Sequence, residues 1–226
     1  MRFFPTTVID DFFDYPDYVA DLARNVKYSE PQLQWYPGRA SVKKIHEIDK
    51  ELYSYILDKI ISVFWDTKYH TVHLDARMDF QKIEPYSDTN SILNTGSIHA
   101  DTDALSLAGI VYLNRNPEKD MGTSIYNLKK EHQFYCAPRE YTEALQRHNS
   151  GMFIPDMERL YKDHCDKYEE TMKVQNKYNR LVLYSPELWH SATSYGTRGT
   201  RYTLRFFISY LSSSDRNYPL VRRASK

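Results

Sequence analysis

Hydrophobic residues in the first third of the chain recur at helical spacing. In the segment YPDYVADLARNVKY, Val19, Leu22, Ala23 and Val26 lie three or four positions apart, and acidic residues precede them. A second apolar stripe runs through IDKELYSYILDKIISVFW, where an apolar residue returns every four positions from Ile48 onward. The pattern therefore predicts two helices whose apolar stripes pack against a core.

After residue 68 the pattern changes to that of short strands. Five segments are rich in β-branched or aromatic residues and are bounded by turn-forming residues: TVHLDARMDFQKIEPY, LSLAGIVYLN, TSIYNL, NRLVLYSP and RYTLRFFISYL. Each predicts a strand.

A charged stretch, residues 127–178, separates the third of these strands from the fourth. Its apolar residues at roughly helical spacing are Met157, Leu160, Tyr161, Tyr168 and Met172. The stretch therefore predicts a helical insertion between two strands of the sheet region. Insertions in this position commonly act as lids over a site on a rigid scaffold, and we expect this one to be more mobile than the sheets.

Two helices, several short strands and a helical insertion indicate the α+β class. We expect a double-stranded β-helix, a cupin-like jelly roll, backed by the N-terminal helices. The 226 residues fit one domain. We expect it to divide into supporting helices (1–67), jelly-roll strands (68–126 and 179–212), an inserted helical lid (127–178) and a C-terminal tail (213–226).

Composition and charge exclude several classes of protein. Thirty basic and thirty acidic residues give zero net charge, which argues against a general nucleic-acid binder. Cys136 and Cys165 lack the spacing of a redox motif or a zinc finger, so we expect two free thiols. The N-terminus does not resemble a signal peptide, and no apolar run approaches the roughly 20 residues that span a bilayer. We therefore expect a soluble, cytoplasmic protein.

Three residues form a candidate metal site. His99 and Asp101 are separated by one residue, so in an extended segment both side chains project to the same face. His190, in SPELWHSA, is the third candidate ligand. Two histidines and one carboxylate leave one face of an ion open, which suits non-haem iron(II). We expect the other histidines to be surface or capping residues: His46, His70, His73, His132, His148 and His164.

A candidate anion site follows on the last strand. Arg201 lies eleven residues after His190, and Thr203 shares its face of the strand. An arginine can hold a carboxylate through two hydrogen bonds, and a neighbouring hydroxyl can add another. Tyr112, in AGIVYLN, could reach the same carboxylate. For Arg201 the alternative is a surface salt bridge, and for Tyr112 a place in the core.

The same strand carries further arginines. Arg201, Thr203 and Arg205 share one face if the strand is regular, and Arg198 in GTRGT should face solvent. The opposite face, expected to pack, carries Tyr202, Leu204, Phe206 and Ile208. A buried arginine without a partner is costly, so Arg205 needs either a protein carboxylate or an acidic group of the substrate.

Several segments, taken in order, resemble the iron(II)- and 2-oxoglutarate-dependent dioxygenase superfamily. The resemblance is to its prolyl-hydroxylase-like branch, including small phage and microbial oxygenases. The matching segments are IDDFFDYPDYVADLA, IHADTD, GIVYLNRNPEKDMGTSIY, NRLVLYSPELWHSA and TRYTLRFFISY. They cover most of residues 8–27 and 78–212. Two departures, Met121-Gly122 in place of a paired glycine and the long stretch 127–177, leave the substrate open.

The resemblance implies a function and a role for each candidate residue. It implies that His99, Asp101 and His190 bind Fe(II), and that Arg201 binds the distal carboxylate of the co-substrate 2-oxoglutarate. Tyr112 and Thr203 match hydrogen-bonding positions nearby. With O2, such an enzyme would hydroxylate a peptide, an amino acid or a small molecule and release succinate and CO2.

Other readings of the same residues stay open. A cupin-like, non-catalytic metal- or ligand-binding jelly roll is one alternative, although it would not need a buried Arg201. A nucleobase substrate is disfavoured by the neutral charge and by the lack of a basic aromatic groove. In a purely structural interaction protein the spacing of these residues would be coincidental. The carboxylate of Asp101 argues against a halogenase. The sequence identifies neither the primary substrate nor the oligomeric state.

Overall fold

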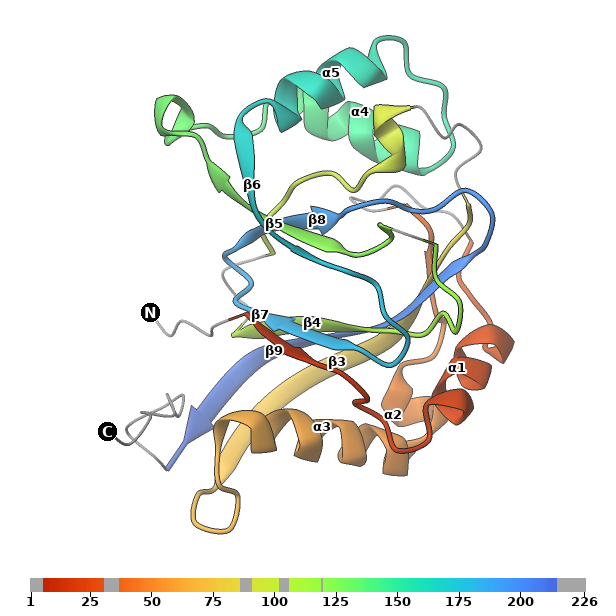
Figure 1. Cartoon of the computed structure of the whole chain (residues 1–226), viewed down its shortest axis with the longest axis vertical. Helices are drawn as coiled ribbons and strands as arrows, with labels where there is room; N and C mark the ends of the chain where they lie inside the picture. Colours follow the sequence, from red (N-terminus) through yellow and green to blue (C-terminus); the bar gives the residue numbers. More distant parts are fainter. Residues whose placement is uncertain (1–5, 31–36, 86–90, 102–105, 119, 215–226) are drawn as a thin grey trace.

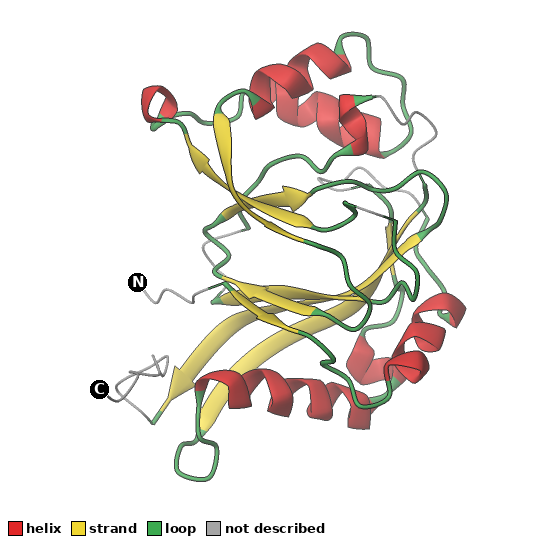
Figure 2. Cartoon of the chain, in the orientation of Figure 1, coloured by secondary structure: helices red, strands yellow, loops and turns green. Residues whose placement is uncertain are grey.

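The computed structural model describes residues 6–30, 37–85, 91–101, 106–118 and 120–214. Two antiparallel β-sheets face each other, and helices cover the outer side of each sheet (Figures 1 and 2). The larger sheet has six strands in the order β1-β7-β4-β9-β3-β2, and the smaller has three in the order β6-β5-β8. Helices therefore form the two outer layers and the sheets the two inner ones.

The elements are as follows. The strands of the large sheet are, in spatial order, β1 (Thr7–Ile9), β7 (Leu181–Tyr184), β4 (Leu107–Tyr112), β9 (Arg201–Ser213), β3 (Val72–Ile83) and β2 (Arg39–Ala40). Those of the small sheet are β6 (Tyr168–Val174), β5 (Thr123–Leu128) and β8 (Trp189–Ala192). The helices are α1 (Pro16–Asn25), α2 (Ile45–Ile48), α3 (Lys50–Phe64), α4 (Arg139–Asn149) and α5 (Met157–Cys165), with short 3-10 turns η1 (Ile92–Asn94) and η2 (Lys130–His132).

Helices α1 to α3 cover the outer face of the large sheet, as Figure 1 shows. Helix α3 begins where the side chain of Asp49 accepts a hydrogen bond from the backbone N–H of Leu52. Its stripe, including Ile56 and Ile60, is fully buried in one cluster with residues of the sheet such as Phe206. The predicted N-terminal helices are therefore confirmed, the second of them divided into α2 and α3.

The two faces of β9 differ in character, as the alternation of its residues predicts. Leu204, Phe206 and Ile208 are fully buried in the core cluster shared with the helices. Arg201 and Arg205, at the alternate positions, lie on the inner face, which is directed at the small sheet. Strand β9 thus presents two arginines to the space between the sheets and an apolar surface to the helices.

The stretch 127–178 is not wholly helical. Residues 168–174 form strand β6, which pairs with β5 and completes one edge of the small sheet, so the prediction of helix at Tyr168 and Met172 is wrong. Helices α4 and α5 lie on the outer side of this sheet (Figure 1). Contacts between rings join the layers, with 5.1 Å between His164 and Tyr168 and 5.1 Å between Tyr168 and Trp189.

Two other expectations can be compared with the structure. Cys136 and Cys165 are free, as predicted. Most of the predicted C-terminal tail lies outside the described residues, which end at residue 214. Within the described part of the chain, the structure has no helix of the length and apolar character needed to cross a membrane.

Candidate metal centre

His99 and His190 face each other across a short antiparallel bridge. The N–H of His99 donates to the carbonyl of His190 over 3.0 Å, and the N–H of His190 donates back over 2.8 Å. The centroids of the two rings are 4.4 Å apart. This pairing holds two histidines that are far apart in the sequence side by side at the end of β8.

Asp101 completes the group. Its backbone N–H donates to the carbonyl of Pro186 over 2.8 Å, which fixes the segment next to β8. Its Oδ2 lies 3.8 Å from Nε2 of His190. One candidate ligand atom from each of His99, Asp101 and His190 lies within 4.8 Å of the others. The structure therefore brings together the three residues that the sequence singled out.

Both imidazole rings are oriented by backbone carbonyls. Nδ1 of His99 lies 2.8 Å from the carbonyl of Ser97, and Nδ1 of His190 lies 2.8 Å from that of Leu188. A carbonyl only accepts, so each Nδ1 carries a proton, which leaves Nε2 as the ring atom that could bind a metal. Burial and the neighbouring His99 lower the pKa of His190 to about 3, so this ring is neutral near pH 7.

The carboxylate of Asp101 fits a metal ion. Its Oδ2 is buried and has no hydrogen-bond partner among the described residues, an arrangement that is costly for an isolated protein. Burial raises the pKa of Asp101, against the lowering effect of His99 and Arg205. A divalent cation would satisfy this oxygen, and two histidines with one carboxylate form the ligand set typical of non-haem iron(II).

Helices α4 and α5 hold the segment that precedes His99. The hydroxyl of Tyr141 is hydrogen-bonded to Oγ of Ser97 over 2.7 Å. The hydroxyl of Tyr161 donates to the carbonyl of Thr95 over 2.8 Å. The helical insertion therefore supports the strand that carries a candidate metal ligand.

His164 belongs to the same support, and the expectation of a surface or capping role for it is wrong. It is 2% exposed, its Nε2 lies 2.8 Å from the carbonyl of Ile98, and its Nδ1 lies 3.0 Å from the hydroxyl of Tyr135. Its ring stacks on Tyr141 with 4.3 Å between centroids. In the part of the chain described, His164 and the other remaining histidines join no metal-binding group.

Arg201 is buried without an acidic partner among the described residues. Arg201 is 4% exposed, and its Nε donates a hydrogen bond to the carbonyl of Met121 over 3.3 Å. Its guanidinium lies 5.7 Å from the centroid of the Tyr112 ring. Burial lowers the pKa of Arg201. The burial excludes the alternative of a surface salt bridge on an edge strand, since β9 is an interior strand of its sheet.

Tyr112 and Thr203 lie opposite each other on β4 and β9 and are both buried. The hydroxyl of Tyr112 is hydrogen-bonded to Oγ1 of Thr123 over 2.8 Å, and that of Thr203 donates to Oε1 of Gln81 over 3.4 Å. Both residues are thus next to Arg201 on the inner face. Their predicted contact with a co-substrate stays a prediction.

Arg205 is paired with a protein carboxylate, one of the two partners that the sequence left open. Its Nε and Nη2 donate to Oδ1 of Asp79 over 3.0 and 2.7 Å. Burial raises the pKa of Asp79, but Arg205 and Lys44 outweigh this effect and the pKa lies below its ordinary value. Arg198 is on the surface, as predicted: its side chain is 82% exposed.

Comparisons with known proteins support the fold. A model of a family described as a family of unknown function (DUF6445) matches residues 4–197. No curated protein matches the sequence. Solved structures, however, resemble this chain over most of its length.

Three of these structures are a protein with bound 2-oxoglutarate, a prolyl hydroxylase and a 2OG-Fe(II) oxygenase family protein. HygX from Streptomyces hygroscopicus, with nickel and 2-oxoglutarate bound, is 13% identical, with a TM-score of 0.55 over 90% of this chain and 82% of that chain. A prolyl hydroxylase from Trichoplax adhaerens, in complex with a hypoxia inducible factor peptide fragment, is 13% identical, with a TM-score of 0.51 over 90% and 82%. A 2OG-Fe(II) oxygenase family oxidoreductase from Burkholderia pseudomallei is 10% identical, with a TM-score of 0.51 over 90% and 83%. At these identities the likeness establishes a shared fold.

Proposed function

We propose that this chain, which belongs to the DUF6445 family, is an iron(II)- and 2-oxoglutarate-dependent oxygenase. The observation that carries the proposal is the buried Oδ2 of Asp101, which has no donor among the described residues and lies beside the Nε2 of His190. Such an atom is costly unless a cation satisfies it. The shared fold with a 2OG-Fe(II) oxygenase family protein supports iron as that cation.

The connectivity of the strands supports a jelly roll, the double-stranded β-helix. From β3 onward, the chain passes from the large sheet to the segment of His99 paired with β8, then to β4, to the hairpin of β5 and β6, and on to β7, β8 and β9. Each step except the β5–β6 hairpin crosses from one sheet to the other. We assign the whole chain to a single domain with helices as outer layers.

Arg201 would bind the distal carboxylate of 2-oxoglutarate. A buried guanidinium needs an anion, and none of the described carboxylates pairs with Arg201. A guanidinium can hold a carboxylate through two parallel hydrogen bonds. Tyr112 and Thr203 flank this position on the neighbouring and the same strand. The other end of the dicarboxylate would then be directed at the metal ligands.

The protein's own groups would bind and orient, while the bound iron with O2 would supply the oxidising chemistry. His190 is held neutral by burial, and its ring is packed against Tyr184 with 4.5 Å between centroids. This packing excludes water from one side of the centre. The reaction we propose is hydroxylation of a peptide, an amino acid or a small molecule, with release of succinate and CO2.

Calorimetry with Ni(II), which binds such ligands without turnover, tests the proposal. Ni(II) should bind in a 1:1 ratio, and 2-oxoglutarate should bind tightly only after the metal is present. Metal binding without any dependent binding of 2-oxoglutarate would favour the non-catalytic, cupin-like alternative. The absence of both would refute the proposal.

A further inference from the structure

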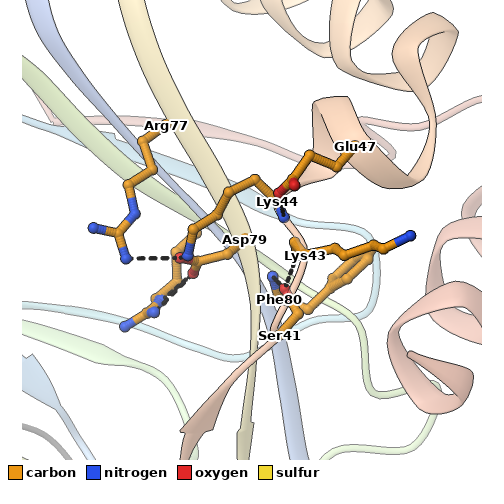
Figure 3. A network of polar contacts seen from close by, with 8 residues as sticks. Ser41, Lys43, Lys44, Glu47, Arg77, Asp79 and Phe80 are labelled. Atoms are coloured by element: carbon orange, nitrogen blue, oxygen red, sulfur yellow. Dashed lines mark hydrogen bonds and ion pairs between the residues drawn. The ribbon is translucent and has the colours of Figure 1, made fainter. Parts of the chain in front are cut away.

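A group of cations surrounds one carboxylate on the inner face of the large sheet. Asp79 of β3 accepts hydrogen bonds from Arg205 at Oδ1, and from Lys44 over 2.8 Å and Arg77 over 3.3 Å at Oδ2. Figure 3 shows Arg77 and Lys44 reaching Asp79 from two different elements. We refer to Lys44, Arg77 and Arg205, with Asp79, as the basic cluster. It holds three positive charges and one negative charge.

The members of the basic cluster differ in how far they are committed to Asp79. The side chains of Asp79 and Arg205 are 1% and 8% exposed and satisfy each other as a buried pair. The side chain of Lys44 is 25% exposed and that of Arg77 is 61% exposed. Because Arg205 alone neutralises Asp79, Lys44 and Arg77 are cations in excess, and Arg77 has most of its surface open to a ligand.

The register of the sheet places Arg77 in line with the metal centre. Arg77 lies opposite Phe207, Phe207 opposite Ala108, and Ala108 opposite Tyr184, across β3, β9, β4 and β7. Tyr184 in turn packs on His190. The row spans three strand spacings, or about 14 Å, and an arginine side chain shortens the gap further. A molecule of a few carbon atoms would therefore reach from Arg77 to the metal ligands.

The floor between the two ends of this row is apolar. Ala108 and Tyr184 belong to the buried cluster between the sheets, and Phe207 packs against it. The guanidinium of Arg205 lies 6.0 Å from the centroid of the Phe207 ring. Of the three floor residues only Phe207 is partly exposed, so its ring offers an apolar surface between the buried Ala108 and Tyr184 and the cationic end at Arg77 and Lys44.

The balance of charge agrees with this arrangement. Among the described residues named so far, four cations (Arg201 and the three of the basic cluster) accompany two carboxylates, those of Asp79 and Asp101. The double charge of a divalent metal would be matched by that of 2-oxoglutarate. Two positive charges of these side chains would then stay unmatched, which would favour a negative charge on the primary substrate.

We propose that the primary substrate carries an anionic group, a carboxylate or a phosphate, which Arg77 and Lys44 bind while its carbon chain packs against Phe207. The inference rests on the proposed function and narrows its substrate class. Arginine and lysine are the side chains that bind such groups best. A cationic substrate would meet repulsion at this end of the site.

The test uses hexanoate and its neutral counterpart hexanamide as probes. The protein is first loaded with Ni(II) and saturated with 2-oxoglutarate, and binding of each probe is titrated by saturation-transfer NMR. Hexanoate should bind about tenfold more tightly than hexanamide, because only its carboxylate can accept charge-assisted hydrogen bonds from both Arg77 and Lys44. Arg77→Gln and Lys44→Gln should each weaken the binding of hexanoate about fivefold and leave the binding of hexanamide unchanged. Neither variant should change the affinity for 2-oxoglutarate.

Lys82→Gln is the matched control. Lys82 lies on the same strand as Arg77 but at a position of opposite parity, and it is also paired with a carboxylate, that of Glu84 at 2.6 Å. The substitution removes the same charge and should leave hexanoate binding unchanged. Equal weakening by Lys82→Gln would show a general effect of net charge and would overturn the inference.

Three further outcomes would also overturn it. They are equal binding of hexanoate and hexanamide, no binding of hexanoate, and competition between hexanoate and 2-oxoglutarate, which would place the probe at Arg201. In each case the proposed function would stand, because Ni(II) and 2-oxoglutarate had bound. Failure of that loading step would instead refute the proposed function, and this inference with it.

Discussion

Two positions on the inner face of β9, four residues apart, carry arginines with different partners. Arg201 and Arg205 are 4% and 7% exposed and lie on the same face of one strand. Arg205 is paired with Asp79 through two hydrogen bonds, whereas Arg201 donates to a backbone carbonyl and has no acidic partner among the described residues. Burial alone therefore does not distinguish a structural arginine from a ligand-binding one; the partner does. The region of Arg205 is complete within the protein, and we propose that an added anion completes the region of Arg201.

The largest expected effect comes from breaking the complete region. Asp79→Ala would leave Arg205 buried without its carboxylate, which should cost about 3–5 kcal/mol of the free energy of unfolding. Urea denaturation followed by circular dichroism measures this cost. The double variant Asp79→Leu/Arg205→Met, which removes both charges, should recover most of the loss. A single variant as stable as the wild type would show that the pair is not a structural element.

The next effect concerns the proposed metal ligands, on which binding of the proposed co-substrate at Arg201 would depend. His99→Ala, Asp101→Ala and His190→Ala should each weaken metal binding by about 100-fold or more, since each removes one of three protein ligands. Calorimetric titration with Ni(II) measures the affinity. The apoprotein of Asp101→Ala should be at least as stable as the wild type, because the variant removes a buried oxygen that has no donor. Wild-type affinity in all three variants would refute the assignment.

A smaller effect should follow from loosening the support of His99. His164→Asn and Tyr141→Phe each remove hydrogen bonds to the segment of Ile98 and Ser97, and each should weaken Ni(II) binding about fivefold, at about 1 kcal/mol per bond. Tyr126→Phe, on the neighbouring strand β5, loses a hydroxyl that contacts Ser191 over 3.2 Å and is the control. If the helices form only a mobile lid, these variants should change substrate affinity and leave metal affinity unaltered.

The smallest effect is a dependence of stability on pH near the Arg201 end. The carboxylate of Glu118 accepts the N–H groups of Thr197, Arg198 and Gly199 in the loop that leads into β9. Burial raises its pKa, but these donors outweigh it and lower the pKa from 4.5 to about 2. A lowered pKa means that the stabilisation is complete above 4.5 and is lost as the pH falls toward 2. Glu118→Gln should therefore lose less stability than the wild type between pH 5 and about 2.5, as thermal unfolding would show.

The sequence singled out the residues around Arg201 and the candidate metal site better than the partner of Arg205. His99, Asp101 and Arg201 were found because spacing and strand parity are local properties. Asp79 lies in a predicted strand, but its partner depends on the register between β3 and β9, which joins segments far apart in the chain. The choice between a protein carboxylate and a substrate group for Arg205 therefore could not be made from the sequence.

Strands β8 and β6 and the support of His99 were missed for related physical reasons. Strand β8 has four residues and a polar sequence, and the exposed residues of β6 leave it without an alternating pattern. His164 has no local feature that separates it from a surface histidine. Its burial comes from contacts with Ile98 and Tyr141, which only the packing of α5 creates.

The central claim is that Arg201, and not Arg205, binds 2-oxoglutarate at an iron centre formed by His99, Asp101 and His190. The most direct test is anaerobic titration of the Fe(II)-loaded protein with 2-oxoglutarate, following the weak visible charge-transfer band of the chelate. The wild type should develop the band, and Arg201→Gln should need roughly 10- to 100-fold more 2-oxoglutarate, as expected for charge-assisted hydrogen bonds of about 1.5–3 kcal/mol. Arg205→Gln should titrate like the wild type. No band in the wild type, or a weakened titration in Arg205→Gln with Arg201→Gln unchanged, would contradict the account.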